Sequence, residues 1–271
     1  MIVLGCDVGA LATKTVLLNN GELLGWDITP NVGRLGQVAE ESLSKVLRKT
    51  GLTLEQIALC WGTGWGKKYI PYPHSPENLI NCLSRGARWL WPAVRTVVDI
   101  GGLTTTVIHL KEQGGILEYR NNDRCASGTG FFIELAAQAL ELPLDELDST
   151  ASRARGRAHI GAQCAVFGES EIISHVNDGV EPAEIVAGLT YAVGLGAATM
   201  VRRLGIVPDI LMTGGVTKIR SVVWSLEENL ATKTCLPDCD PQIVAAIGAA
   251  LAGADGLQGQ VAINRITGDP S

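Results

Sequence analysis

The chain has 271 residues, of which 46% are apolar, so it is long enough to bury one large hydrophobic core or two smaller ones. Its formal net charge is −6 and only 18% of its residues are charged, which excludes a basic surface of the kind that binds nucleic acid. Residues 1–7 read as a strand rather than as a charged segment leading into an apolar export signal, so we expect a cytoplasmic protein.

The first motif of interest lies at the N-terminus and is repeated in the middle of the chain. Residues 4–13 read Leu-Gly-Cys-Asp-Val-Gly-Ala-Leu-Ala-Thr, and residues 97–105 read Val-Val-Asp-Ile-Gly-Gly-Leu-Thr-Thr. In each copy an apolar strand reaches an aspartate, crosses a turn of small residues and returns as a second strand. Glycine suits such a turn because it accepts positive φ and lets the backbone approach a ligand closely. The aspartate at each strand end is placed to hold a metal–phosphate complex.

Helices and a third glycine turn complete the pattern. Residues 37–49 have the apolar spacing of an amphipathic helix that closes at Gly51. Residues 210–216 read Ile-Leu-Met-Thr-Gly-Gly-Val, another apolar strand that runs into a glycine pair. Strands alternating with helices predict an α/β fold of two similar halves that clasp a nucleotide between them. We expect a first domain at 1–95 plus 250–262, a second at 96–249, and a loose tail at 263–271.

The longest uncharged apolar run, 185–201, is shorter than the roughly 20 residues that a membrane span needs. Pro182 precedes the run and Arg202 and Arg203 follow it. We therefore expect a buried helix that begins at Pro182 and ends at Gly205, and no association with a membrane.

Two of the seven cysteines stand in similar settings. Cys125 and Cys164 each precede a segment with helical apolar spacing, so each is expected at or just before the start of a helix. The free N–H groups and positive potential of a helix N-terminus stabilise a thiolate and an anionic cluster. An iron–sulfur cubane generally takes four thiolates, so two chains related by a twofold axis are needed to complete one. The alternative is that both are buried core cysteines.

The remaining cysteines have less specific settings. Two of them flank Leu-Pro-Asp, but no second pair at zinc spacing exists in the sequence. The other three fall on expected strands or an expected helix and are interpreted as core residues. In chain order the five are Cys6, Cys60, Cys82, Cys235 and Cys239.

These motifs together resemble one family of the actin, sugar-kinase and heat-shock-chaperone superfamily. The family comprises the activators of 2-hydroxyacyl-CoA dehydratases and the ATP-binding subunits of benzoyl-CoA reductases. Two cysteine motifs carry most of the resemblance, Asn-Asp-Arg-Cys-Ala-Ser-Gly-Thr-Gly and Cys-Ala-Val-Phe-Gly-Glu-Ser-Glu. The matching stretches span nearly the whole chain: 62–66, 99–102, 122–130, 164–171, 212–216 and 246–251.

The resemblance implies two actin-like (ribonuclease H-like) domains with a nucleotide cleft between them. It also implies that Cys125 and Cys164 hold one [4Fe–4S] cluster shared between two subunits of a homodimer, or of a heterodimer with a homologous subunit. ATP hydrolysis would then drive low-potential electrons from a ferredoxin or flavodoxin to a CoA-ester reductase or dehydratase component.

The same resemblance assigns the residues of the ATP site. Asp7 and Asp99 would position Mg²⁺ through waters, and the two hairpins would cradle the phosphates with backbone N–H groups. Gly214 and Gly215 would let the backbone pack against the adenosine. The expected nucleotide contacts are Gly9, Ala10, Leu11, Ala12, Thr13, Lys14, Gly101, Gly102, Leu103, Gly214, Gly215 and Val216.

The second hairpin departs from the dehydratase-activator pattern. Those activators commonly read Gly-Gly-Gln-Asp where residues 101–104 read Gly-Gly-Leu-Thr. A glutamine is suited to orienting an attacking water in phosphoryl transfer, and Leu103 is not. The departure implies either slow hydrolysis or an attacking water that Thr104 or Thr105 positions.

Two other functions fit parts of this pattern. A sugar or small-acid kinase of the same superfamily shares the hairpins but needs neither Cys125 nor Cys164. A nucleotide-dependent scaffold or regulator would bind ATP without any cluster.

Overall fold

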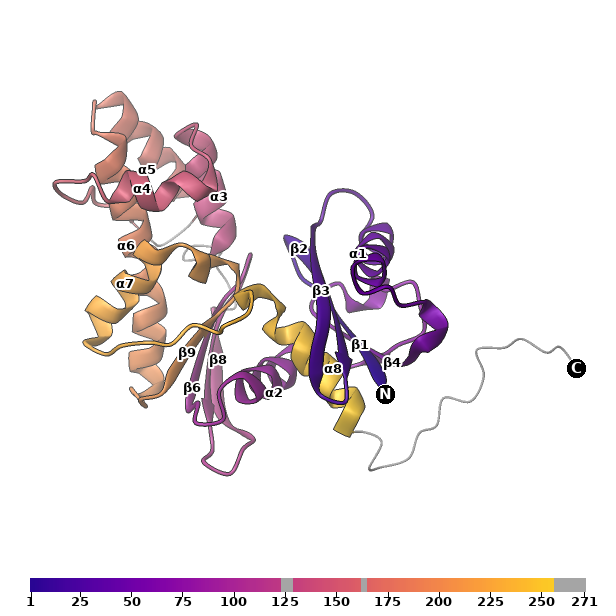
Figure 1. The fold of residues 1–271 in the computed structure, drawn as a ribbon. Helices are drawn as coiled ribbons and strands as arrows, with labels where there is room; N and C mark the ends of the chain where they lie inside the picture. Colours follow the sequence, from indigo (N-terminus) through magenta and orange to yellow (C-terminus); the bar gives the residue numbers. More distant parts are fainter. Residues whose placement is uncertain (123–128, 162–164, 256–271) are drawn as a thin grey trace, which may run out of the picture. The chain divides into compact units, whose positions relative to one another are not determined.

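The computed structural model describes residues 1–122, 129–161 and 165–255 (Figure 1). The chain divides into two compact units: the first combines Met1–Trp89 with Ile243–Ser271, and the second is Leu90–Gln242. The predicted tail at 263–271 lies outside the described residues.

The first unit is built on a five-stranded sheet of order β3-β2-β1-β4-β5. Neighbouring strands β1, β2 and β3 are antiparallel, and β4 and β5 run parallel to β1. The strands are β1 (Ile2–Val8), β2 (Ala12–Asn19), β3 (Glu22–Pro30), β4 (Ile57–Thr63) and β5 (Ser75–Pro76).

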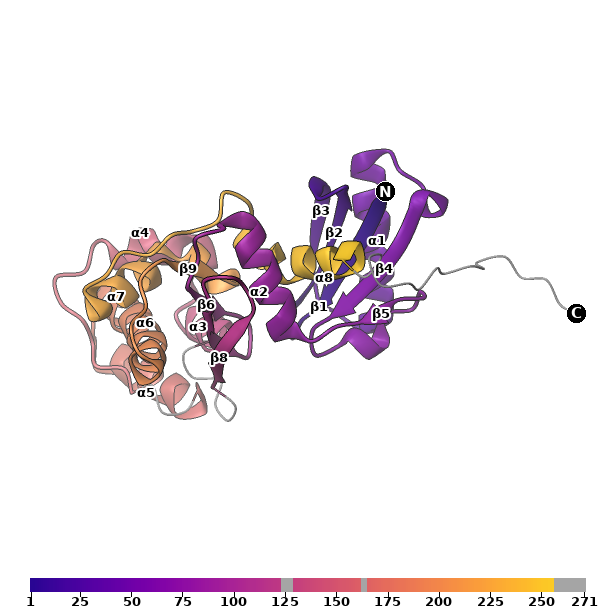
Figure 2. The ribbon, with the colours of Figure 1, turned by 90° about the horizontal axis from the view of Figure 1, so that it is seen from below.

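Helices cover both faces of this sheet because successive side chains of β1 point to opposite sides. Leu4 packs with Leu43 and Val46 of α1 (Leu35–Thr50), whereas Gly5 lies against the backbone of α8 (Val244–Asp255). Figure 2 shows α1 and α8 on the two sides of the sheet. The predicted helix at 37–49 is confirmed, and it ends at Gly51 in the left-handed conformation. Helix α2 (Leu79–Leu90) packs on α8, with Cys82 against Gly248.

The second unit repeats the strand order of the first. Its four-stranded sheet has the order β8-β7-β6-β9. As in the first unit, three neighbouring strands, β6, β7 and β8, are antiparallel, and the fourth, β9, runs parallel to β6. The strands are β6 (Thr96–Ile100), β7 (Thr105–Leu110), β8 (Ile116–Asn121) and β9 (Ile210–Thr213). The repeat predicted from the two Asp-x-Gly motifs is therefore a repeat of the fold.

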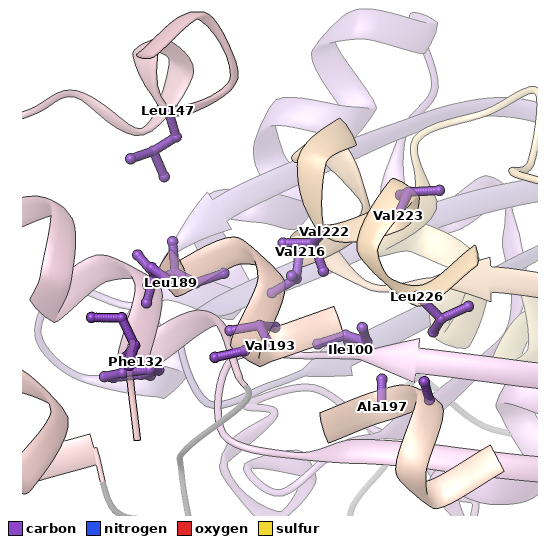
Figure 3. Packing of buried hydrophobic residues seen from close by; sticks show 14 of the residues in the cluster. Ile100, Phe132, Leu147, Leu189, Val193, Ala197, Val216, Val222, Val223 and Leu226 are labelled. Carbon is purple, nitrogen blue, oxygen red and sulfur yellow. The ribbon is translucent and has the colours of Figure 1, made fainter. Parts of the chain in front are cut away.

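The second unit carries most of the helices and a large hydrophobic core (Figure 3). Phe132, Leu189 and Leu226 are fully buried in it together with Ile100 of β6. The helices are α3 (Gly130–Ala139), α4 (Leu147–Ala151), α5 (Ala165–Asn177), α6 (Pro182–Leu204) and α7 (Arg220–Leu230).

Helix α6 matches its prediction in both ends and burial. Pro182 is its first residue and Gly205 closes it. The helix is long and apolar enough to cross a membrane, yet 61% of its most apolar 18-residue stretch is buried inside the protein. It is the central core helix of the second unit.

Candidate functional site

Asp7 lies near the end of β1 and is almost completely buried. Its Oδ2 lies 3.1 Å from Nζ of Lys14, which is directly opposite on β2, and the two side chains are 7% and 14% exposed. Its Oδ1 is also buried and has no hydrogen-bond partner within the described part of the chain. A buried carboxylate oxygen without a partner costs about 1–3 kcal/mol or more. This oxygen is therefore suited to accept from a ligand, such as water bound to a cation.

The turn that follows Asp7 is held by a residue just beyond the end of β3. Gly9 N donates to Ala12 O at 3.1 Å, closing the turn. Asn31 Nδ2 donates to the carbonyls of Gly9 at 2.8 Å and Ala10 at 3.3 Å, and Asn31 Oδ1 accepts from Thr13 Oγ1 at 2.8 Å. Asn31 thus links both sides of the turn through its side-chain hydrogen bonds.

Gly64 completes the surroundings of Asp7 from the end of β4. Its φ is +87°, and a Cβ at this position would lie 2.4 Å from both Asp7 Oδ1 and Val8 O. No side chain fits there, so the backbone after β4 closely approaches the carboxylate. Lys67, in the short helix that follows, donates to the carbonyl of Glu77 at 2.9 Å.

Asp99 occupies the equivalent place on β6 but has different neighbours. Its Oδ1 accepts a hydrogen bond of 2.8 Å from Thr213 Oγ1 at the end of β9. Asp7 and Thr63 are paired in register on β1 and β4, as Asp99 and Thr213 are on β6 and β9. The residue opposite Asp99 on β7 is Thr106, where the first unit has a lysine.

The second hairpin is joined to the start of α3. Gly101 N donates to Thr104 O at 2.8 Å, and the carbonyls of Gly101 and Gly102 accept from the first two N–H groups of α3 at 2.9 and 2.8 Å. Leu103 is 44% exposed at the tip. Thr104 is half-buried and Thr105 is buried.

The glycine pair after β9 repeats the arrangement at Gly64. Gly214 has φ +89°, and a Cβ there would lie 2.3 Å from Ile100 O. Gly215 begins a short 3-10 helix, Gly215–Lys218, and the side chain of Val216 is buried in the core. Val216 therefore has only its backbone to offer a ligand.

The predicted cluster ligands, Cys125 and Cys164, lie outside the described residues. Within the described part of the chain, no three histidine, cysteine or acidic side chains are grouped as a metal site. Burial raises the pKa of the Cys6 thiol to about 11 and that of Cys82 to about 12, so both are neutral at physiological pH. Neutral, buried thiols are poor ligands, and the prediction that these two are core residues is confirmed.

Sequence reasoning missed three residues of these sites. Asn31 follows β3 with no motif around it, and its role depends on strand pairing. Thr213 and Gly64 lie inside stretches that carry the family resemblance, 212–216 and 62–66. Their positions beside the aspartates, however, follow only from how the strands pair in the folded chain.

Two sheets of the same strand order, each with an aspartate at a glycine hairpin, define the actin-like ATPase class. A model of the BadF/BadG/BcrA/BcrD ATPase family matches residues 4–253, and the chain belongs to this family.

Relatives and solved structures agree with this assignment. The activator of lactoyl-CoA dehydratase from Anaerotignum propionicum is 36% identical over 251 residues, covering 93% of this chain and 96% of the relative. A benzoyl-CoA reductase subunit from Thauera aromatica is 29% identical over 264 residues, covering 93% of this chain and 93% of the relative. The structure of the activator of 2-hydroxyisocaproyl-CoA dehydratase from Clostridium difficile with bound ADPNP matches with a TM-score of 0.89 at 32% identity, covering 99% of this chain and 100% of that one.

Proposed function

We propose that the chain is an ATP-hydrolysing activator that passes low-potential electrons to a CoA-ester reductase or dehydratase. The proposal of ATPase activity depends mainly on the buried Asp7 Oδ1, which lacks a hydrogen-bond partner among the described residues. This atom lies at the start of a hairpin whose turn is hydrogen-bonded by Asn31. The relatives supply the partner class, because they activate dehydratases or belong to a reductase.

Asp7 fits a role in holding hydrated Mg²⁺. Mg²⁺ usually keeps several waters and takes one or two carboxylates together with the phosphates of its nucleotide. Asp7 Oδ1, which has no partner among the described residues, would accept from such a water, while Lys14 pairs with Oδ2 and lies beside the turn that would bind phosphate. In the second unit Asp99 and the hairpin 101–104 would serve the same nucleotide.

Thr104 would orient the attacking water in place of the glutamine that activators commonly carry. The burial of the two threonines supports this choice: Thr105 is only 2% exposed, whereas Thr104 is half-buried in the turn. Leu103 has no polar group and is exposed at the tip.

The proposal of an iron–sulfur cluster depends on which cysteines can supply thiolate ligands. The buried thiols of Cys6 and Cys82 are poor sources of thiolate, because burial raises the pKa of each. Cys125 and Cys164 would supply two thiolates per chain, and a homodimer, or a heterodimer with a related subunit, would supply the four that a [4Fe–4S] cluster takes. When bound, such a cluster accepts and donates single electrons, here from a ferredoxin or flavodoxin donor.

Iron analysis of protein purified without oxygen tests this function. We expect about four irons per two chains in the wild type, and loss of iron together with weakened dimerisation in Cys125→Ser and Cys164→Ser. Cys235→Ser is the matched control, since Cys235 is exposed, and it should keep its iron. Full iron content in Cys164→Ser would contradict the ligand assignment. Protein that hydrolyses ATP without any iron would instead indicate a kinase or a scaffold.

A further inference from the structure

Helix α7 presents a tryptophan at the surface of the second unit. The helix buries Val222, Val223 and Leu226 in the core of this unit (Figure 3). Trp224 lies between these positions in the sequence but points away from the core, and it is 60% exposed. The packing of α7 therefore does not depend on this indole. Tryptophan is among the residues that most often anchor contacts between proteins.

Trp224 lines two neighbouring hollows on this surface. The first hollow has a volume of about 310 Å³ and is bounded by the aromatic ring of Tyr191 as well as by Trp224. The second hollow, of about 480 Å³, follows along α7 and shares Trp224 and Glu228 with the first. Much of the first is lined by small side chains, among them Ala151, Ala154, Ala187 and Ser221. A small molecule would occupy one hollow, whereas an extended peptide that crosses Trp224 can place side chains in both.

The acidic side chains that line the two hollows are all engaged within the protein. Asp148 accepts from the first two backbone N–H groups of α7, at 2.8 and 2.9 Å. Glu227 pairs with Lys233 and Glu228 with Arg157, each at 2.7 Å. These carboxylates consequently have little left to offer a cationic ligand.

Arg155 is the charged side chain at the first hollow that is available to a ligand. It is exposed, and it makes no hydrogen bond or ion pair within the described ranges of the chain. Its neighbour Arg153 donates to the neutral hydroxyl of Thr150 at 3.1 Å. The charge available here is therefore positive, although the whole chain has a net charge of −6. A guanidinium group pairs with a carboxylate through two parallel hydrogen bonds.

We propose that Trp224, Arg155 and the two hollows form a docking site for an acidic segment of a partner protein, one that carries an aromatic or large aliphatic side chain. A carboxylate of the segment would pair with Arg155, and the apolar side chain would enter the first hollow between Trp224 and Tyr191. The inference stands apart from the proposed function, because none of these residues belongs to the nucleotide hairpins or to the cysteine motifs.

An array of short peptides tests the proposal. Each peptide consists of Asp, Glu and Ser around one central Phe, Trp or Leu, and a matched set has Lys and Arg in place of the acids. We expect the wild type to prefer the acidic set. For the strongest binder, calorimetry should show Kd raised about tenfold or more by Trp224→Ala and by Arg155→Glu, as for central contacts of an interface. Arg155→Lys should retain most of the preference, because it keeps the charge.

Two exposed residues elsewhere provide matched controls. Arg203 lies in the same unit but lines neither hollow, and Trp65, 73% exposed, lies in the first unit. Arg203→Glu and Trp65→Ala should bind as the wild type does. Because all four side chains are exposed, every variant should keep the thermal unfolding midpoint of the wild type.

Three results would overturn the docking site. The first is equal binding of acidic and basic peptides by the wild type. The second is wild-type affinity in folded Trp224→Ala and Arg155→Glu. The third is displacement of the peptide by an equal concentration of N-acetylphenylalanine, which would show that the hollow takes a small carboxylate instead.

Discussion

The hairpins that carry Asp7 and Asp99 share a frame but place different residues opposite the aspartate: Lys14 faces Asp7, and Thr106 faces Asp99. In both, the aspartate is in register with the threonine that ends a parallel strand, and a glycine of positive φ follows that threonine. Asp7 is paired with Lys14 and keeps one buried oxygen without a partner in the described residues. One oxygen of Asp99, Oδ1, accepts a hydrogen bond from the hydroxyl of Thr213. The repeated fold thus places the two carboxylates at equivalent positions in the two units.

The largest expected effect separates the two aspartates. Asp7→Asn should cut the ATPase rate by a factor on the order of 10² or more, because it removes the charge that is proposed to organise Mg²⁺ and phosphate. Asp99→Asn should lose less, on the order of tenfold, since Thr213 already engages its Oδ1. Single-turnover hydrolysis with both variants measures the difference. Equal losses would show that the two hairpins are interchangeable.

A smaller effect concerns the glycine beside Asp7. Gly64→Ala should destabilise the protein by about 2 kcal/mol more than Gly33→Ala, because overpacking adds to the cost of positive φ. Both glycines have positive φ, +87° and +96°, but a Cβ at Gly33 meets nothing within 4 Å. Denaturant unfolding of the two variants makes the comparison, and equal losses would mean that the backbone moves away from Asp7 freely.

The smallest effect concerns the hydroxyl on Asp99. Thr213→Val should destabilise the second unit by about 1.5 kcal/mol, the lower end for a hydrogen bond to a charged group. Thr63→Val should cost less, since the Thr63 hydroxyl donates to a backbone carbonyl, that of Glu77, at 3.3 Å. Thermal unfolding of both variants would check this order. A costlier Thr63→Val would place the more important hydroxyl in the first unit.

The sequence alone predicted the repeated hairpins, because Asp-x-Gly after an apolar run is a local signal. It also predicted α6, whose proline and glycine mark the two ends. The partners of the two aspartates could not be predicted. Thr213 is far from Asp99 in the chain and meets it only through the register of β6 and β9. Lys218 and Gln242 likewise carry no motif, and their contact depends on two short 3-10 helices, Gly215–Lys218 and Pro241–Ile243, that the fold brings together.

Access of an iron chelator to the protein in different nucleotide states tests most directly the claim that ATP use is coupled to electron transfer. The proposed cluster ligands, Cys125 and Cys164, belong to the same unit in sequence as Asp99. Exposure and nearby N–H donors both influence the reduction potential of a cluster. We predict that MgATP or a non-hydrolysable analogue changes the chelation rate of the anaerobically purified protein, whereas Mg²⁺ alone does not. Identical rates in every nucleotide state, in protein that hydrolyses ATP, would contradict the account.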